Sequence, residues 1–402
     1  MKKIMIILPE QVYFLKTIKD PVLSPDHEEL SIYYENIIYP YSDVYDVEVK
    51  SEYGNDYKRY WQISDYTKDE PFPVTFKVYA PYGELLAEKT VTMIPVDKTY
   101  SKPFNLLTIG DSMTRTGVYM EHINSKLYNI NFKGTRSFNG HLFHEGRGGW
   151  ALGTYLNKTD NDPSPFLFPV NHENYYGNMD FYKHTKNFKE DMYYYSGYHH
   201  LRDIKDGECY YSMGKLYDYS GNEISDSVEW EFNFKRYMNR YEIGHLDAVS
   251  FLFGANDLQI TEYCDTEKHV QDYIFNLNVM IKSIRDFNPD IKIIINMPVP
   301  GADQNAWGLR SCLGSGKRYN YNMMMLGKAI IENYSDDKNI YISPMGACID
   351  SLYGFASTHK KANCYDNSDE KIQSNWVHPH QSGYRQMGDV LAAVIEKIRN
   401  DK

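Results

Sequence analysis

The sequence is poor in cysteine and has no long apolar run. It holds five cysteines in 402 residues, an odd number with no Cys-x-x-Cys pair. This argues against a disulfide scaffold, a zinc ribbon and a thioredoxin-type site. No apolar run approaches the roughly 18 residues that a membrane-spanning helix needs. Basic residues are also few: 43 lysines and arginines face 54 aspartates and glutamates, a net charge of −11. Such a chain repels phosphate backbones and anionic lipids, so we expect neither nucleic acid nor a membrane as partner.

Tyrosine is the abundant aromatic residue, with 38 copies against five tryptophans. Its ring joins a flat apolar face to a polar tip, which suits sugar-binding surfaces and sandwich cores alike. Apolar residues make up 42% of the chain, which is ordinary for a globular protein. At a prior of about 150 residues per domain, the length indicates two or three domains.

Residues 1–98 contain strand patterns only, and we predict a small all-β sandwich domain there. The patterns lie at 29–39, 45–53, 73–80 and 85–96. The apolar run Ile4–Leu8, preceded by Lys2 and Lys3, stops at Pro9, short of a signal-peptide core, and no small-residue cleavage site follows. We therefore expect a first strand rather than a secretion signal, and a cytoplasmic protein. A glycan substrate would instead favour an extracellular or phage-associated protein.

A second region, 104–402, follows a polar linker and alternates strands with helices. Its apolar strands lie at 104–109, 249–253, 291–297 and 340–343. An apolar stripe at three- and four-residue steps predicts a last amphipathic helix, through Tyr384, Met387, Leu391, Val394 and Ile398. The alternation predicts a parallel sheet covered by helices, with ligands bound beyond the carboxyl ends of the strands.

Residues 151–244 interrupt this alternation. The stretch is rich in turn residues and in tyrosine, which occurs in runs at Tyr175-Tyr176, Tyr193-Tyr194-Tyr195 and Tyr210-Tyr211. We interpret it as one long insertion with hairpins. Loops inserted into an α/β scaffold usually shape the binding site, although a surface elaboration with its own small core explains the pattern equally well.

Four short motifs fall on loops where such a sheet would bind a ligand. They are Gly110-Asp111-Ser112, Gly148-Gly149-Trp150, Gly254-Ala255-Asn256-Asp257 and His378-Pro379. A serine between a strand and a helix exposes its hydroxyl on a turn, and an asparagine at a strand end can direct its amide toward an oxyanion. Paired glycines allow close backbone approach, and a loop histidine can act as general base. Each motif alone also fits a helix cap, a turn or a plain loop.

Together, and in this order, the motifs resemble those of the SGNH/GDSL hydrolase family over about residues 104–400. The resemblance implies a flavodoxin-like three-layer α/β/α sandwich, with Ser112 as nucleophile and His378 as base. It also implies an oxyanion hole made by the backbone N–H groups of Ser112 and Gly149 and the side chain of Asn256. No metal or organic cofactor is implied. His378 and His380 form a His-x-His pair, but no third zinc ligand with a matching spacing accompanies them.

One position departs from the family pattern. The family usually carries an aspartate three residues before the histidine, where this chain has Asn375. Such an aspartate orients the imidazole and stabilises its protonated form, and its loss in a serine protease costs about 10⁴ in kcat. Three outcomes stay open: Asn375 orients His378, a backbone carbonyl or another carboxylate does so, or the site only binds. The carboxylates near in sequence are Asp366, Asp369 and Glu370.

These residues favour ester hydrolysis through an acyl-enzyme. The polar chain, with a mean hydropathy of −0.58, and the tyrosine-rich insertion favour a sugar ester. We therefore expect O-deacetylation of a polysaccharide or oligosaccharide, with Trp150, Trp307 and Trp376 as candidate sugar contacts. A lipase or acyl-thioesterase is the alternative among enzymes, and a glycan-binding module that has lost activity is the alternative among binding proteins. No feature indicates the oligomeric state.

Overall fold

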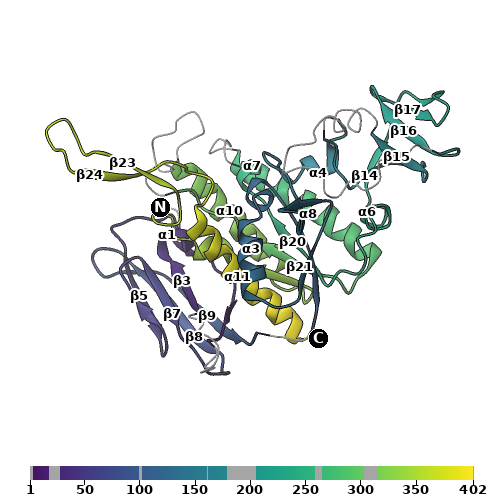
Figure 1. Cartoon of the computed structure of the whole chain (residues 1–402). Helices are drawn as coiled ribbons and strands as arrows, with labels where there is room; N and C mark the ends of the chain where they lie inside the picture. The colour runs from purple at the N-terminus through teal and green to yellow at the C-terminus, as the bar shows by residue number, and fades with distance from the viewer. Residues whose placement is uncertain are drawn as a thin grey trace.

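The larger part of the protein is built on a seven-stranded sheet (Figure 1). The computed structural model describes residues 3–17, 28–98, 102–160, 162–178, 205–258, 265–302 and 316–401. The strands are β10 (Phe104–Gly110), β11 (Ile130–Lys133), β12 (Arg136–Phe138), β13 (Leu142–Gly146), β20 (Ala248–Leu252), β21 (Lys292–Asn296) and β22 (Ile340–Ser343). Five of them run parallel in the order β11-β10-β20-β21-β22, and β13 also runs parallel to β10, beside Ile109 and Gly110. In chain order this is 2-1-3-4-5, the flavodoxin-like arrangement, so the predicted parallel α/β sheet is confirmed.

The helices of this region bury one apolar face each. They include α3 (Val118–Lys126), α8 (Thr266–Phe287), α10 (Gly316–Tyr334) and α11 (Gln381–Asn400). All five residues of the predicted stripe in α11 are buried. Helix α3 packs against α11, and Figure 1 shows the two lying across the front of the sheet. Helix α11 begins three residues after His378, so its packing fixes where the loop that carries the histidine meets the sheet.

The N-terminal residues form two further main sheets. One consists of β2 (Gln11–Leu15), β9 (Leu85–Val96), β8 (Phe72–Tyr79) and β5 (Asp46–Ser51), and the other of β3 (Glu29–Tyr33), β7 (Tyr60–Ser64) and β6 (Asn55–Asp56). Inward side chains of both sheets, among them Phe14, Ile32, Trp61 and Val74, share one apolar cluster. These side chains reach the cluster because buried residues alternate with more exposed ones along strands such as β8, so that every second side chain points inward.

The prediction of one strand over 29–39 was wrong in its middle. A single helical turn, α1 (Tyr34–Ile37), separates β3 from the short strand β4 (Ile38–Tyr39). The turn lets the chain leave its pairing with β7 and pair with β1 (Met5–Ile6) instead. All four residues of α1 are buried, so tertiary packing outweighs the β-propensity of the segment here.

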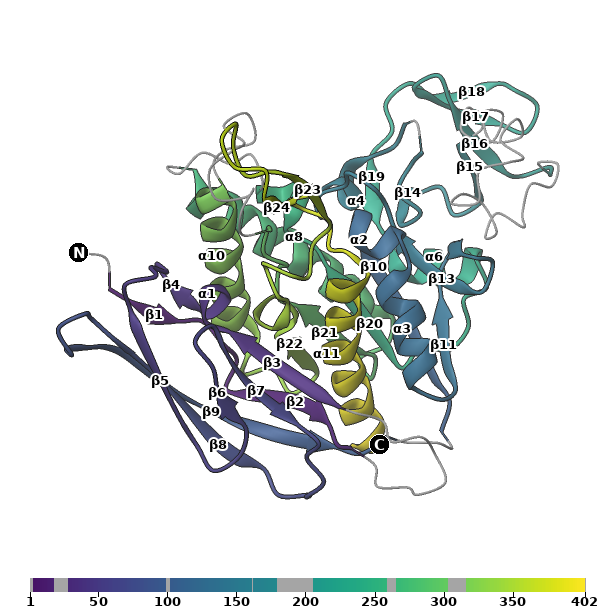
Figure 2. The same ribbon diagram turned by 60° about the vertical axis from the view of Figure 1, so that its left-hand side comes forward.

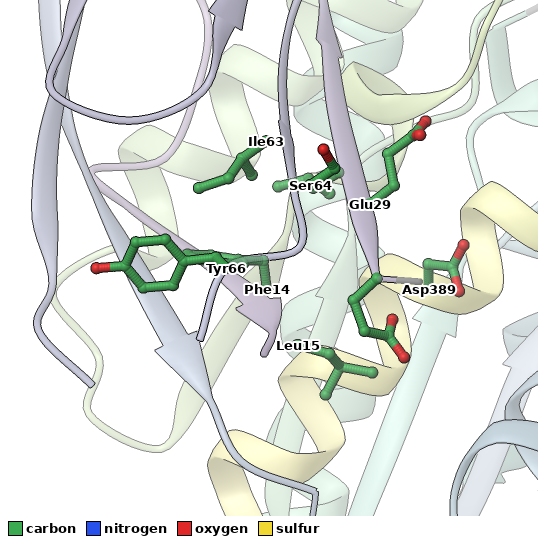
Figure 3. Close-up of a pocket in the computed structure, with 9 residues that line it drawn as sticks. Phe14, Leu15, Glu29, Ile63, Ser64, Tyr66 and Asp389 are labelled. Atoms are coloured by element: carbon green, nitrogen blue, oxygen red, sulfur yellow. The ribbon is translucent and has the colours of Figure 1, made fainter. Parts of the chain in front are cut away.

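The N-terminal sheets share their core with the α/β region. Cys348 and Val390, from the far end of the chain, belong to the same apolar cluster as Trp61. The buried carboxylate of Glu28 pairs with Lys98 at 2.7 Å and with Lys126 at 2.6 Å. A cavity of about 10 Å³ lies at this junction, between strands β2 and β3 and Asp389 of α11. Figure 3 shows the residues that line it. It is too small for any substrate, and none of its lining residues belongs to the four motifs.

Two elaborations project from one end of the molecule. The described part of the insertion contains α4 (Thr154–Asn157), β14 (Leu167–Pro169), β15 (Tyr175–Asn178), β16 (Cys209–Ser212), β17 (Lys215–Asp218), β18 (Glu223–Ser225), β19 (Trp230–Phe232) and α6 (Phe234–Arg240). The run Tyr193–Tyr195 lies outside the described residues. A second hairpin joins β23 (Ser357–Lys361) to β24 (Asp369–Gln373). Figure 2 shows this hairpin and strands β15–β18 at the upper end of the molecule.

Among the helices of the described residues, none combines the length and apolarity that crossing a bilayer requires.

Because α11 carries the loop of His378, loss of its packing should destabilise the fold. We expect Leu391→Ala, in a side chain with no exposed surface, to lower the free energy of unfolding by about 2–5 kcal/mol. Phe275→Ala removes a large apolar side chain that is 69% exposed on α8 and should change it by less than about 0.5 kcal/mol. Denaturant unfolding of both variants checks this, and equal losses would contradict it.

Candidate active site

Ser112 and His378 meet across 266 positions of sequence. Ser112 is the first residue of the short helix α2 (Ser112–Arg115), and Asp111 alone separates it from β10. Its Oγ lies 2.8 Å from Nε2 of His378. Both side chains are half-buried, so the pair is sheltered yet open to a ligand. At this distance the imidazole can accept the hydroxyl proton in one step.

The end of β10 is held from both sides, which fixes Ser112. Asp111 caps α2, since its Oδ1 accepts a hydrogen bond from the Met113 N–H at 2.9 Å. Burial, followed by the charge of Asp257, raises the pKa of the Asp111 carboxyl to about 7. The Gly110 carbonyl accepts hydrogen bonds from the Arg147 N–H and the Tyr155 hydroxyl, both at 2.9 Å. The serine therefore sits on a rigid turn.

His378 is positioned by its backbone. Oδ1 of Asn375 accepts hydrogen bonds from the N–H groups of Val377 at 3.1 Å and His378 at 3.0 Å. The next turn is held where the His380 N–H donates to the Gly354 carbonyl at 2.8 Å. Asn375 thus uses Oδ1 to hold the backbone of the loop, and this is the oxygen that would otherwise accept a hydrogen bond from the imidazole.

No carboxylate supports the imidazole in the described part of the chain, where Ser112 is the one hydrogen-bond partner of the His378 ring. Asp366, Asp369 and Glu370 are exposed on the β23–β24 hairpin or its connecting loop, and none of them bonds the ring. The sequence left open whether Asn375 or one of these carboxylates orients the ring. In the described residues neither of them bonds it.

Arg115 is the charged neighbour of the histidine. Burial lowers the pKa of His378 below its ordinary value, and the positive charge of Arg115 lowers it further. The guanidinium packs over Gly148, where an added Cβ would lie 2.8 Å from the Arg115 Cζ. The sequence motifs did not single out Arg115, although a residue three positions after Ser112 on a helix lies on the same side of that helix.

The loops of Asn256 and Gly149 are tied to each other. Nδ2 of Asn256, in α7 (Ala255–Leu258), donates to the Trp150 carbonyl at 3.1 Å, which leaves its second N–H. The carboxylate of Asp257 accepts hydrogen bonds from the Leu152 N–H at 2.9 Å and from the Gly254 N–H at 3.1 Å. Burial raises the pKa of Asp257 to about 6.

Gly149 itself is exposed and has a φ of +77°, a conformation that favours glycine. The structure places open space where a Cβ would stand. Within the described residues, the backbone N–H groups of Ser112 and Gly149 donate to no protein acceptor. Both donors are thus available to a ligand oxygen.

A buried ion pair lies beneath this loop, and the sequence reasoning missed it. The Arg147 guanidinium has no exposed surface and pairs with Glu145 at 2.6 Å. Glu145 also accepts hydrogen bonds from the Tyr237 hydroxyl at 2.8 Å and from the Thr135 N–H at 2.6 Å. Breaking such a pair by removing one partner is costly, so the pair fixes the backbone that leads to Gly149. The signal was the acid and the base that flank Gly146, just before the Gly148-Gly149-Trp150 motif.

The tryptophans that we predicted as sugar contacts fall in three different places. The Trp150 side chain is only 8% exposed and packs edge-on against Tyr155, with ring centroids 4.9 Å apart. That burial leaves little of the indole face to a sugar, contrary to the expectation. Trp376 is half-buried and packs edge-on against Tyr319 at 5.7 Å. Trp307 lies outside the described residues.

Within the described residues, no group of three or more histidine, cysteine, aspartate or glutamate side chains could hold a metal ion.

No protein-family model matches the chain, and no curated protein matches it. Solved structures are similar to it over about three quarters of its length. A carbohydrate acetylesterase from Sinorhizobium meliloti is 12% identical with a TM-score of 0.34, covering 74% of this chain and 100% of that one. A family 3 carbohydrate esterase from Clostridium thermocellum is 14% identical with a TM-score of 0.33, covering 74% and 98%. A possible lipase from Chitinophaga pinensis is 13% identical with a TM-score of 0.35, covering 73% and 98%. Identities and scores this low assign no activity or substrate to this chain.

The charge environment of His378 can be measured without any substrate. We expect NMR titration to give His378 a pKa below the ordinary histidine value, so that the ring is neutral at pH 7. Arg115→Gln should raise it toward that value, because one of the two causes that disfavour the imidazolium is removed. Arg285→Gln, at the end of α8 and paired with Asp337, is the matched control and should not move it. An unchanged titration in Arg115→Gln would contradict this account.

Proposed function

We propose that the protein is a serine esterase that works through an acyl-enzyme. The observation that carries the proposal is the 2.8 Å contact between the Ser112 hydroxyl and Nε2 of His378 at the carboxyl end of β10. Ligands of open α/β sheets bind at this edge. A neutral imidazole in contact with a turn serine is the arrangement that nucleophilic catalysis requires.

The reaction follows from these groups. Ser112 Oγ attacks the ester carbonyl while its proton passes to Nε2 of His378, which becomes positively charged. The tetrahedral oxyanion is stabilised by the backbone N–H groups of Ser112 and Gly149 and by the free amide N–H of Asn256. Collapse breaks the bond to the alcohol, which takes the proton from His378. Water, deprotonated by the same ring, then attacks the acyl-serine, and the acid and free serine are released.

For the substrate we propose an O-acetyl group on a polysaccharide or oligosaccharide. Arg115 acts on the His378 ring and Asn375 holds its backbone, and such polar and charged neighbours suit a hydroxyl-rich alcohol better than a lipid. The tyrosine-rich strands of the insertion project from the same end of the molecule as the β23–β24 hairpin, whose second strand leads to His378 (Figure 2).

A second candidate is a glycan-binding module with little turnover. The observation that favours it is the absence, among the described residues, of a carboxylate bonded to the His378 ring. Without that charge, formation of the imidazolium is less favourable. The two candidates share a ligand and differ in whether acetate is released.

Acetate release from acetylated glycans separates them. We expect wild-type protein to release acetate and Ser112→Ala to lose at least about 10³-fold in kcat, because the nucleophile is gone. Ser125→Ala, an exposed serine on α3, is the matched control and should behave as wild type. Acetate release that survives in Ser112→Ala would overturn the proposal. Binding of the glycan without release by folded wild-type protein would favour the binding module.

A further inference from the structure

Arg115 lies one helical turn from Ser112, and the described residues give it no counter-charge. Its side chain is half-buried, and within the described residues its guanidinium forms no ion pair and no hydrogen bond. Two arginines that follow it in the α/β region are paired, Arg147 with Glu145 and Arg136 with Asp162. A partly desolvated charge is costly unless a partner balances it, so a guanidinium left unpaired beside a reactive pair points to a ligand.

The backbone around Arg115 fixes where the charge lies. A Cβ on Gly148 would come within 2.8 Å of the Arg115 Cζ and 2.9 Å of its Nη1, so the guanidinium lies directly on this glycine. A Cβ on Gly146 would lie 2.4 Å from the Arg115 backbone nitrogen, so the two segments pack without side chains between them. The charge is therefore held beside Gly149 and within electrostatic reach of His378.

The charge balance of the proposed reaction is incomplete. Proton transfer makes His378 positive while Arg115 is already positive nearby, and in the described residues no carboxylate bonds the ring. Like charges at short range oppose each other strongly in a partly buried site. A substrate that brings a negative charge to Arg115 would remove this opposition and bind more tightly in the transition state than in the ground state.

We propose that Arg115 selects esters whose alcohol part carries a carboxylate, such as an O-acetylated acidic sugar. The carboxylate binds the guanidinium and supplies the negative charge that the site lacks. A planar guanidinium meets a carboxylate through two parallel N–H···O bonds, which fixes the sugar as well as attracting it. One guanidinium balances the single charge of a carboxylate, whereas a phosphate monoester carries about −1.5 to −2. This inference rests on the proposed esterase function.

The test compares two substrates that differ only in charge. They are an O-acetylated hexuronic acid and the O-acetylated hexuronamide with its acetyl group at the same position. We expect wild-type protein to prefer the acid by about 10-fold or more in kcat/KM, because hydrogen bonds to charged groups are the stronger ones. Arg115→Gln should bring the ratio close to one, and Arg115→Lys should retain part of it. Arg285→Gln, which removes an arginine from the far end of α8, should keep the wild-type ratio.

Calorimetry on the Ser112→Ala protein makes the same comparison without turnover. The acid should bind more tightly than the amide, and Ser112→Ala/Arg115→Gln should lose the difference while retaining the wild-type circular dichroism spectrum. Equal kcat/KM values for acid and amide in wild type, or an unchanged ratio in Arg115→Gln, would overturn the inference and leave the esterase intact. If the protein is not an esterase, the wild type releases no acetate from the acid, the amide or 4-nitrophenyl acetate. The calorimetric comparison still tests the role of Arg115 then, because equal binding of acid and amide overturns the inference.

Discussion

The contact between Ser112 and His378 depends on two ends of the α/β region meeting at one edge of the sheet. Strand β10 opens this region and carries the serine, while helix α11 closes it and follows the histidine. Helix α11 packs against α3, the helix that follows the serine turn, so the two halves of the pair share one packed unit. The 2.8 Å distance is therefore a consequence of core packing rather than of local sequence.

Around this pair, the described acids have structural roles and the charge that acts on the histidine is positive. The acids nearest the site are used for structure: Asp111 caps α2, and Asp257 joins two loops, with pKa values raised to about 7 and about 6 by burial. Among the described residues, the charge that acts on His378 is the guanidinium of Arg115. A histidine with a lowered pKa stays neutral and able to accept a proton, yet its charged form is poorly supported. An anion supplied by the substrate would complete this arrangement.

Much of the fold could be predicted because it rests on periodic patterns. The apolar stripe of α11 and the all-buried strand β20 are visible in the sequence, since burial on one or both faces dictates their residue types. The turn of α1 was not visible, because burial between β3 and β4 overrode a strand-like sequence. The junction of the N-terminal sheets with α11 was also missed, since it depends on one apolar cluster that contains both Trp61 and Val390, which are distant in the chain.

The site was predictable in its motifs and not in its electrostatics. Ser112, Asn256 and His378 could be named because strand-end loops gather at one edge of a parallel sheet. The sequence could not show that Asn375 binds backbone N–H groups, nor that Arg115 lies against Gly148. Both depend on side-chain directions within loops, which no periodicity encodes. Trp150 was misjudged for the same reason, because its ring turns toward Tyr155 and the interior.

The central inference is that His378 activates Ser112, with no carboxylate bonded to the ring among the described residues. Its most direct test is reaction of the whole protein with a fluorophosphonate, followed by mass spectrometry of the intact chain and of the peptide that contains Ser112. The account predicts one adduct on Ser112 in the wild-type protein and at least a roughly 100-fold slower reaction in His378→Ala, because general-base catalysis contributes about 10²–10⁴. Absence of an adduct on Ser112 in folded wild-type protein, or equal rates in His378→Ala, would contradict it.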